Sequence, residues 1–462
     1  MTTLARLLHP RHVAVFGGGW AANVVEQCRK MGFKGAVWPV HPTRETLGGV
    51  PCYRSIADLP EAPDAAFIGV NRHATLDVVA ELARVGAGGA VCFASGFAEA
   101  EDGREAGAAL QARLVAAAGD MAVLGPNCYG LINYLDGALL WPDQHGGTRA
   151  ERGVAILGQS SNMLINMTMQ ARALPIAYCI AAGNQAQQDL ASIALALVRD
   201  PRVSAIGLHI EGVRDVRGVE ALAAAARDAG KPVVALKVGR SASAQAATIS
   251  HTASISGGDA AGRAFLRRLG IALVDTLPEF LETLKFLHAV GPLPGRAIAS
   301  VSCSGGEASL IADLAEGRAL SFRPFTPEEK AGIAAALGPQ VTVANPLDYH
   351  TFVWGDAAAM ERAFTAVTTA GHDLTIFILD FPRPDRCDDA SWQPAVEAIC
   401  AAARAGGRAV AVAATLPEAM PEARAAALLA AGIAPMGGLA ETLTAAEAAA
   451  HVAECRALPP PP

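Results

Sequence analysis

The sequence contains few aromatic residues, few charged ones and no long run of apolar ones. Aromatic residues occupy 5% and charged residues 18% of its 462 positions. The longest charge-free stretches, such as residues 153–171, still include Gln, Ser, Asn and Thr, whereas a membrane-spanning helix needs about 20 mostly apolar residues. Charged residues also interrupt the first positions before any apolar core of a signal peptide. We therefore expect a cytoplasmic protein without a membrane segment.

The cysteine content and the net charge restrict the compartment and the ligands that we expect for this protein. The nine cysteines are an odd number and form no C-x-x-C pair, unlike a disulfide framework or a zinc site. Asp and Glu outnumber Lys and Arg, 44 to 37, and no basic cluster offsets this, so the phosphate backbone of a nucleic acid finds no basic surface. The pattern predicts a reducing compartment, no metal site in this chain and no nucleic-acid partner.

Short apolar runs alternate along the chain with Ala- and Leu-rich stretches of helical period. Strands buried on both faces of a parallel sheet have this continuous apolar pattern, and their alternation with helices is typical of α/β folds. The sequence thus predicts an α/β protein with parallel sheets throughout. The expected strands are residues 12–17, 35–40, 65–70, 89–95, 121–125, 153–158, 204–210, 232–237, 297–302, 374–380 and 408–413.

Two segments rich in Gly, Pro and charge interrupt this alternation, at residues 141–153 and 290–297. Such compositions are typical of exposed connections. We predict three domains, at residues 1–145, 150–291 and 295–457. Residues 458–462 end in four prolines and are expected to form a disordered tail, because proline does not fit a helix interior.

A glycine-rich loop follows the first expected strand. Gly17-Gly18-Gly19-Trp20 begins a Gly-x-Gly-x-x-Ala pattern, which either forms a simple tight turn or lets the backbone approach a pyrophosphate at a helix N-terminus. The second strand ends in His41-Pro42, where an NAD-binding fold would place an acidic residue on the ribose. A nucleotide with a phosphorylated ribose, such as CoA, is therefore favoured over NAD.

Polar residues follow the next strands of this region. Asn71, Ser95 and Asn127 all fall at carboxyl ends of expected strands, where open α/β sheets bind ligands. Ligand contact and a plain turn or cap are both consistent with these residues. Cys128 is either a nucleophile or a buried structural thiol, and the absence of a neighbouring histidine favours the thiol.

Two loops of small polar residues each come between a strand and a helix. They are Gln159-Ser160-Ser161 and Ser304-Gly305-Gly306. Such residues act as helix N-caps, or the loop amides bind an anion at the positive end of the helix. Two such loops in one chain predict one shared phosphate, although Glu307 would repel it unless its side chain turns away.

A histidine lies within a run of small hydroxyl-bearing residues, Ser250-His251-Thr252-Ala253-Ser254. An imidazole is a nucleophile near neutral pH because its pKa is about 6.5. Taken alone, a histidine among small residues is more often an ordinary loop or capping residue than a nucleophile.

Further motifs indicate a function for this histidine. Together with its loop, they resemble the NDP-forming acyl-CoA synthetases, the superfamily that includes succinyl-CoA synthetase. The Ser250–Ser254 loop is similar to the family loop whose histidine is transiently phosphorylated. The other matching segments, in order, are residues 64–70, 94–99, 125–128, 158–161, 182–184, 210–212 and 344–348. The resemblance implies a CoA-binding Rossmann-like domain followed by two flavodoxin-like domains.

The resemblance also implies roles for individual residues. Glu211 matches the acid that hydrogen-bonds the phosphorylated histidine, and Gln159, Ser160, Ser161, Ser304, Gly305 and Gly306 match its phosphate-binding loops. The expected CoA contacts are Gly17, Gly18, Gly19, Trp20, His41, Pro42, Asn71, Ser95, Gly96 and Asn127. The aromatic segment 349–354 is expected to form either an acyl pocket or a surface loop.

The predicted function is that of an α-type subunit of an NDP-forming acyl-CoA synthetase. Carboxylate, CoA and ATP or GTP would give acyl-CoA, ADP or GDP, and phosphate. Since no ATP-grasp module is recognised in the 462 residues, a separately encoded ATP-grasp β subunit is expected to bind the nucleotide and Mg²⁺ in a hetero-oligomer. The alternatives are a CoA-dependent acyl or carbamoyl transferase that does not use ATP, and a CoA-binding regulatory subunit.

Overall fold

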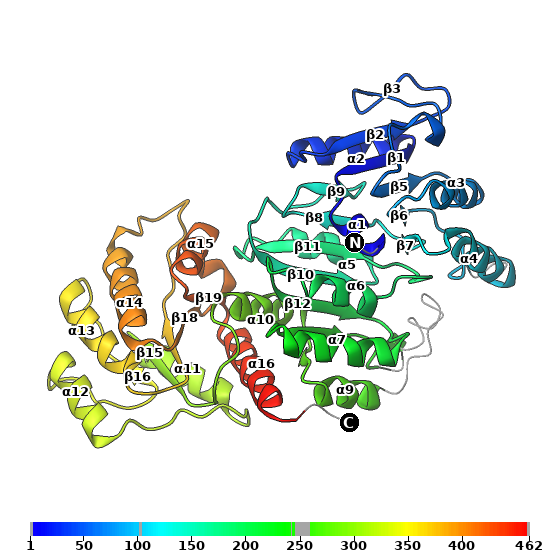
Figure 1. Cartoon of the computed structure of the whole chain (residues 1–462). Helices are drawn as coiled ribbons and strands as arrows, with labels where there is room; N and C mark the ends of the chain where they lie inside the picture. Colours follow the sequence, from blue (N-terminus) through cyan, green and yellow to red (C-terminus); the bar gives the residue numbers. More distant parts are fainter. Residues whose placement is uncertain (1–2, 101–103, 242, 245–258, 460–462) are drawn as a thin grey trace. The chain divides into compact units, whose positions relative to one another are not determined.

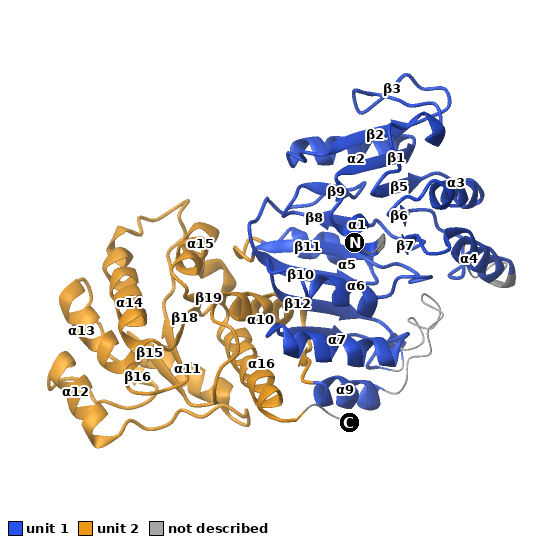
Figure 2. Cartoon of the chain, in the orientation of Figure 1, with its two compact units in different colours: residues 1–170, 175–269 blue, residues 171–174, 270–462 orange. Residues whose placement is uncertain are grey.

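The computed structural model describes residues 3–100, 104–241, 243–244 and 259–459. The chain forms two compact units (Figure 2), and each is described by itself. Unit 1 comprises residues 1–170 and 175–269, and unit 2 comprises residues 171–174 and 270–462. The predicted serine-histidine loop, residues 250–254, and the final prolines 460–462 lie outside the described residues.

The first sheet of unit 1 is parallel, with strand order β2-β1-β5-β6-β7 (Figure 1). Strands β1, β6 and β7 are buried along their whole length and, apart from His12 in β1, apolar, which explains why they form hydrophobic runs in the sequence. The elements of this region are α1 (Thr3–Leu8), β1 (His12–Gly17), α2 (Gly19–Lys30), β2 (Ala36–Val40), the antiparallel pair β3 (Thr46–Leu47) and β4 (Val50–Pro51), η1 (Ile56–Asp58), β5 (Ala65–Gly69), α3 (Arg72–Arg84), β6 (Gly89–Cys92), α4 (Arg104–Ala118) and β7 (Ala122–Leu124).

A second sheet of unit 1 has strands in the order β13-β12-β10-β11-β8-β9. The strands from β13 to β11 are parallel, whereas β8 and β9 form an antiparallel hairpin at the β11 edge. The elements are β8 (Leu131–Asn133), β9 (Ala138–Leu140), β10 (Gly153–Gly158), α5 (Ser161–Thr168), β11 (Ile176–Ala181), α6 (Leu190–Leu197), β12 (Val203–Ile210), α7 (Val216–Asp228), β13 (Val233–Lys237) and α9 (Asp259–Arg268).

The hairpin β8–β9 connects the two sheets of unit 1. Cys28 of α2 exchanges hydrogen bonds with the backbone of Leu139 in β9, at 3.3 and 3.4 Å. Asn23 of the same helix donates to the carbonyl of Pro142, and Asn133 of β8 donates to the carbonyl of Leu8 in α1. These contacts satisfy buried polar groups from both sheets, so the two sheets form one compact unit.

Unit 2 contains a parallel sheet with strand order β16-β15-β17-β18-β19. Local sequence sets the starts of its helices: Thr276 and Glu279 form a capping box at α10, and Thr326 and Glu329 do so at α12. The elements are β14 (Ala272–Val274), α10 (Leu277–Ala289), β15 (Ile298–Ser302), α11 (Gly305–Ala315), α12 (Pro327–Leu337), β16 (Leu347–Asp348), α13 (Ala357–Thr368), β17 (Leu374–Ile378), η2 (Ala390–Trp392), α14 (Gln393–Gly406), β18 (Ala409–Ala414), η3 (Pro417–Ala419), α15 (Glu422–Ala430), β19 (Ala434–Gly437) and α16 (Leu439–Ala457).

The predicted α/β class with parallel-sheet domains is confirmed, and each expected strand is present within a few residues of its predicted bounds. The expectation of parallel sheets throughout is wrong at the β8–β9 hairpin, whose strands sequence periodicity did not reveal because each is only three residues long. The segment 141–153 is not exposed along its whole length, since Trp141 is fully buried. The division into three domains stays a prediction.

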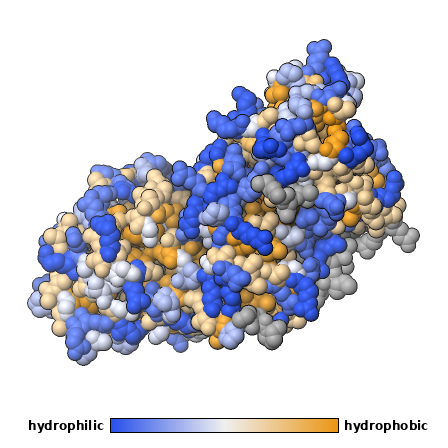
Figure 3. Space-filling model, in the orientation of Figure 1, coloured by the Kyte–Doolittle hydropathy of each residue, from blue (hydrophilic) through white to orange (hydrophobic). Residues whose placement is uncertain are grey.

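Surface hydropathy and the composition of the helices are the two features relevant to membrane insertion. Hydrophilic and hydrophobic residues are intermixed over the face of the molecule drawn in Figure 3. Among the described residues, no helix has both the length and the apolar composition needed to cross a membrane.

Candidate functional site

A cleft with a volume of about 1180 Å³ lies in unit 1, at the carboxyl ends of strands of its first sheet and beside the loops that follow β10 and β12. It brings together predicted site residues that are up to 140 positions apart in the sequence, because parallel strands place their carboxyl ends at one edge. The predicted residues that line it are Asn71, Ser95, Gly96, Asn127, Gln159, Ser160, Ser161 and Glu211.

The glycine-rich loop lies beside this cleft. Gly17 has a φ of 126°, and a Cβ atom there would lie 2.4 Å from the carbonyl oxygen of Gly69, so only glycine fits. Gly18 occupies the N-cap position of α2 without any side-chain cap. Trp20 is 48% exposed, and its ring centroid lies 5.6 Å from that of Phe93, which lines the cleft. The loop therefore offers a helix N-terminus that an anion can approach.

A tight turn follows β2 at the expected ribose position. The His41 Nδ1 accepts hydrogen bonds from the backbone amides of Thr43 and Arg44, at 3.2 and 3.0 Å, which fixes this turn. Arg54 donates to the Arg44 carbonyl at 2.9 Å. The Arg44 guanidinium lies near Gly18, 3.9 Å from the place of a Cβ atom there. Sequence reasoning missed Arg44, although a cation three positions after His41 was a usable signal.

Asn71 has the capping role that the sequence left open. Its side-chain oxygen accepts hydrogen bonds from His73 N and Ala74 N at the start of α3. The next residue, Arg72, lines the cleft and donates to the carbonyl of Gly96 at 2.8 Å. Gly96 has a φ of 90°, and its amide donates to Glu99 Oε1 at 2.6 Å, so this corner of the cleft has a fixed backbone.

Asn127 lies in the left-handed region, with a φ of 57°, as its residue type allows. Its side-chain nitrogen donates to Asn184 Oδ1 at 3.4 Å, and Asn184 in turn donates to Glu99 and Gln111. A Cβ atom on Gly183 would lie 2.4 Å from the Pro126 carbonyl oxygen, so the loops after β7 and β11 are in close contact.

The neighbouring cysteine is a structural thiol. Cys128 is 2% exposed, and burial raises the pKa of its thiol to about 12. The thiolate is the nucleophilic form of cysteine, and this pKa leaves almost none of it at neutral pH. The geometry therefore favours the structural interpretation over a nucleophile.

Gln159 connects the loop after β10 to the end of β12. It is 6% exposed, and its Oε1 accepts hydrogen bonds from Glu211 N at 2.6 Å and Gly212 N at 3.2 Å. Its Nε2 is buried and has no partner among the described residues. Ser160 caps α5 through Met163 N, at 3.4 Å. The loop thus has a buried amide donor available to an acceptor at the start of a helix.

The described chain on both sides of the predicted histidine loop is held in place. Lys237 ends β13, is 6% exposed and forms an ion pair with Asp259 at the start of α9, with 2.9 Å between Nζ and Oδ1. Val238, Gly239 and Ala244 line the cleft described above. His251 itself lies outside the described residues. The segment that leads toward it therefore begins at the cleft.

The second predicted phosphate loop lies in unit 2. Ser304 is the N-cap residue of α11 and makes no side-chain cap, while Gly305 and Gly306 are exposed. Glu307 follows them, and burial, together with the nearby Asp380 and Asp348, raises the pKa of its carboxyl to about 7. The predicted repulsion between Glu307 and an anion is therefore weakest when this carboxyl is protonated.

We expect Glu307→Gln to stabilise the chain more at pH 8 than at pH 5. The folded-state pKa of about 7 is above the ordinary value of 4.5, so wild type loses stability as the pH rises through this window. The neutral glutamine avoids that loss. Thermal unfolding of both proteins at the two pH values measures the difference in Tm, and an equal difference at pH 5 and pH 8 contradicts the prediction.

The aromatic segment 349–354 divides between the core and the surface of unit 2. Tyr349 is buried, and its ring packs on Phe364 with 5.3 Å between centroids. Trp354 packs on Trp392, whereas Phe352 is 60% exposed. Most of the aromatic surface of this segment is thus used in packing, which supports neither a pure surface loop nor an open acyl pocket.

Taken together, the described groups favour binding of anions. Unit 1 combines two helix N-termini, a buried amide donor and two arginines near one cleft, all of which suit phosphates. No group of three His, Cys, Asp or Glu side chains in the described parts of the chain is arranged to hold a metal ion.

Comparison with known proteins matches two domain models to this chain. Residues 11–134 match the model of a CoA binding domain, and residues 151–287 match that of a succinyl-CoA ligase like flavodoxin domain. The chain is 29% identical to the α subunit of acetate–CoA ligase (ADP-forming) II of Pyrococcus furiosus, over 74% of each chain. The chain therefore contains a CoA binding domain and a succinyl-CoA ligase like flavodoxin domain, and it is similar in sequence to ADP-forming acyl-CoA ligases.

Some relatives are longer than this chain. The trans-feruloyl-CoA synthase FCS1 of an unknown prokaryotic organism is 30% identical over 78% of this chain, which spans about half of its length (52%). The fold of this chain is similar to that of the apo acetyl-coenzyme A synthetase 1 from Ca. Korarchaeum cryptofilum. The TM-score is 0.83 at 23% identity, with 98% of each chain covered.

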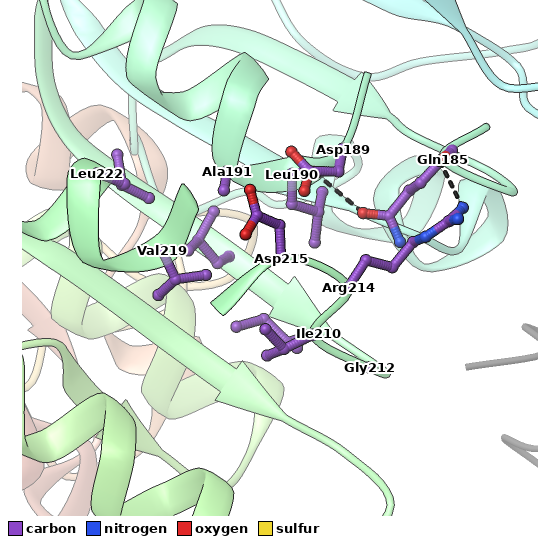
Figure 4. A pocket seen from close by; sticks show the side chains of 12 residues that line it. Gln185, Asp189, Leu190, Ala191, Ile210, Gly212, Arg214, Asp215, Val219 and Leu222 are labelled. Atoms are coloured by element: carbon purple, nitrogen blue, oxygen red, sulfur yellow. Dashed lines mark hydrogen bonds between the residues drawn. The ribbon is translucent and has the colours of Figure 1, made fainter. Parts of the chain in front are cut away.

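A small pocket of unit 1 lies between α6, α7 and β12 (Figure 4). Leu190, Ile210 and Val219 give it apolar walls, while Arg214 at its edge donates to the carbonyls of Asn184 and Gln185. Its volume is about 20 Å³, so it accommodates a group of the size of one water molecule.

Proposed function

We propose that this chain is the α-type component of a cytoplasmic NDP-forming acyl-CoA synthetase. It would convert a carboxylate, CoA and ATP or GTP into acyl-CoA, ADP or GDP, and phosphate. The observation that carries the proposal is the cleft of unit 1, which joins the carboxyl edge of the CoA-binding sheet to Gln159, Ser160 and Glu211. A CoA thiol held on one side of the cleft and a phosphoryl group held on the other would both reach the carboxyl group of one acid, the thiol at its carbon and the phosphoryl group at its oxygen.

CoA would bind along the first sheet. The uncapped N-terminus of α2 at Gly18 and the guanidinium of Arg44 suit its phosphates, and Arg72 lies farther along the cleft. The acidic residue that holds a free ribose in NAD-binding proteins is replaced by His41-Pro42, which suits the phosphorylated ribose of CoA.

His251 would act as the phosphoryl carrier. In acyl-CoA formation, the phosphorylated imidazole would transfer its phosphoryl group to a carboxylate oxygen of the acid, which gives the acyl phosphate and free histidine. The CoA thiol would then lose its proton and displace phosphate from the acyl carbon, which gives acyl-CoA and phosphate. Glu211 would hold the other ring nitrogen and stabilise its positive charge, while Gln159, Ser160 and Ser161 bind the phosphate. In unit 2, Ser304, Gly305 and Gly306 would bind phosphate through the amides that begin α11.

A partner subunit would bind the nucleotide and transfer its phosphoryl group. The relative of similar extent in Pyrococcus furiosus is named as an α subunit, which supports a separate second subunit for this chain. We propose an ATP-grasp β subunit that binds ATP or GTP with Mg²⁺ and passes the phosphoryl group to His251.

Phosphate labelling tests this function. With ³²P-phosphate and an acyl-CoA, the chain is expected to acquire acid-labile, base-stable label, because the acyl phosphate formed in the cleft phosphorylates His251 and releases the free acid. With γ-³²P-ATP and Mg²⁺ alone, no label is expected until an ATP-grasp polypeptide from the same organism is added. Mass spectrometry then locates the phosphate.

Two outcomes contradict the proposal in different ways. Tight CoA binding without label, with or without the ATP-grasp polypeptide, indicates a CoA-binding regulatory subunit. Acyl transfer to a second acceptor without any phosphoprotein indicates a transferase. Efficient labelling by ATP without a partner contradicts the split arrangement alone.

A further inference from the structure

The residues that line the cleft of unit 1 come from two different sheets. One set follows strands of the first sheet and includes Gly96 and Asn127, whereas the other follows strands of the second sheet and includes Asn184 and Glu211. Within the proposed function, the first set holds the CoA thiol and the second set holds the phosphoryl group. A reaction between these groups depends on contacts that fix the two sets of loops relative to each other.

Glu99 makes such a contact through both oxygens of its carboxylate. Its Oε1 accepts hydrogen bonds from the backbone amides of Gly96 at 2.6 Å and Phe97 at 3.3 Å, in the loop after β6. Its Oε2 accepts a hydrogen bond from the side-chain nitrogen of Asn184, in the loop after β11. One partly buried carboxylate therefore joins a loop of the first sheet to a loop of the second.

Asn184 is held by further contacts on every side. Its side-chain nitrogen also donates to Gln111 Oε1 of α4 at 3.0 Å, and its Oδ1 accepts from Asn127 Nδ2 at 3.4 Å. Its backbone amide donates to the Pro126 carbonyl at 3.0 Å, and its own carbonyl accepts from the Arg214 guanidinium at 2.9 Å. Each polar atom of Asn184 has a partner, so the position of its side chain is fixed.

The carboxylate of Glu99 determines which way the amide of Asn184 points. An ionised carboxylate only accepts hydrogen bonds, so the nitrogen of Asn184 must face it. Hydrogen bonds to an ionised acceptor are also stronger than those between neutral groups. A carboxylate at this position therefore holds the two loops together more tightly than a neutral side chain does.

We propose that Glu99 is a positioning residue of the ligase reaction, which holds the loop of Gly96 and the loop of Asn184 at the separation that acyl transfer requires. This inference rests on the proposed function, because it concerns the placement of the groups that react there. A misplacement of about 1 Å between reacting groups costs on the order of 100-fold in rate.

The alternative is a purely local role for Glu99. It lies three positions after Gly96, and in a local role its Oε1 closes this short turn while its Oε2 contributes nothing to the reaction. The contact with Asn184, which lies 85 positions away in the sequence, is what distinguishes the two roles. Variants that keep the turn but change this contact therefore decide between them.

Three variants change the contact, and a fourth is the matched control. Glu99→Gln still accepts from the amides of Gly96 and Phe97, but its side-chain nitrogen faces the nitrogen of Asn184. Asn184→Asp places two carboxylates together, which repel. The double variant Glu99→Gln/Asn184→Asp exchanges donor and acceptor, restores the contact and keeps the wild-type net charge. Glu81→Gln removes the charge of a glutamate in α3 whose side chain is 41% exposed.

The measurement is the single-turnover rate of ³²P-phosphate incorporation, with acetyl-CoA and benzoyl-CoA as probes of different acyl size. In both single variants we expect the maximum rate to fall on the order of 10- to 100-fold. The acyl-CoA concentration at half-maximal rate should stay within about threefold of the wild-type value, because the binding groups are retained. The double variant should recover most of the rate, and Glu81→Gln should keep all of it. Thermal unfolding verifies that every variant is folded at the assay temperature.

The possible failures have distinct signatures. Absence of label in wild type with both probes contradicts the proposed function itself. Wild-type rates in both single variants overturn only the inference. Equal losses in the single and double variants show that Glu99 acts within its own turn, which also overturns it. A higher half-maximal concentration at an unchanged maximum rate shows a role in CoA binding alone and overturns it as well.

Discussion

Replacing His251 by asparagine is expected to abolish phosphate labelling and to lower acyl-CoA formation by at least roughly 10³-fold, as the loss of a covalent nucleophile does. Asparagine has a similar size, but its side-chain amide is not nucleophilic. The measurement is acid-labile ³²P incorporation from acyl-CoA and phosphate, together with ligase activity after addition of the ATP-grasp polypeptide.

CoA binding is the internal control for this variant. Because the proposed CoA contacts belong to the first sheet, the Kd of CoA for His251→Asn should stay within about twofold of the wild-type value. His451→Asn in α16 changes a histidine of unit 2 that has no proposed role and should retain labelling. Labelling of His251→Asn at the wild-type level refutes the assignment of the phosphoryl carrier.

Gln159→Leu is expected to reduce both stability and activity. Leucine cannot accept the hydrogen bonds that the amides of Glu211 and Gly212 now donate to Gln159 Oε1. Each buried amide left unpaired costs about 1–3 kcal/mol, and the loop that positions Ser160 loses its tie to β12. Denaturant unfolding should show a lower midpoint, and labelling should fall by about 10²-fold or more, the usual effect of removing a positioned donor.

Gln159→Glu separates the two roles of this side chain. A carboxylate still accepts hydrogen bonds from both backbone amides, but it removes the buried Nε2 donor and adds a negative charge that repels phosphate. At pH 8 we expect labelling to fall strongly, while the denaturant midpoint stays closer to the wild-type value. Wild-type labelling by this variant contradicts a role for Nε2 in phosphate binding.

Much of the site could be predicted because it depends on where strands end. Apart from His12 at the start of β1, the runs that became β1, β5, β6, β7 and β10 are apolar over their whole length, since parallel strands covered on both faces contain few polar residues. The polar residue after each run therefore falls at one edge of a sheet. Asn71, Ser95, Asn127 and Gln159 lie in one cleft for this reason.

Other features could not be predicted from local pattern. Strand β11 is as buried as its neighbours, but the flanking Pro175 and the polar Tyr178 made its apolar run difficult to recognise in the sequence. Strands β8 and β9 are too short to show a period. The role of Asn71 as a cap was one of two open interpretations until its hydrogen bonds to α3 were seen.

The sequence by itself determined the α/β class and most strands, because periodicity depends on neighbours along the chain. Its short motifs carried the resemblance to acyl-CoA synthetases and the prediction, still to be tested, that His251 carries phosphate. The tertiary structure decided that Gln159 pairs with the amide of Glu211, that Arg44 lies near Gly18, and that Glu99 contacts Asn184. Those contacts join residues far apart in sequence. They depend on how twisted sheets, hairpins and helices pack, and the same local patterns are compatible with many packings.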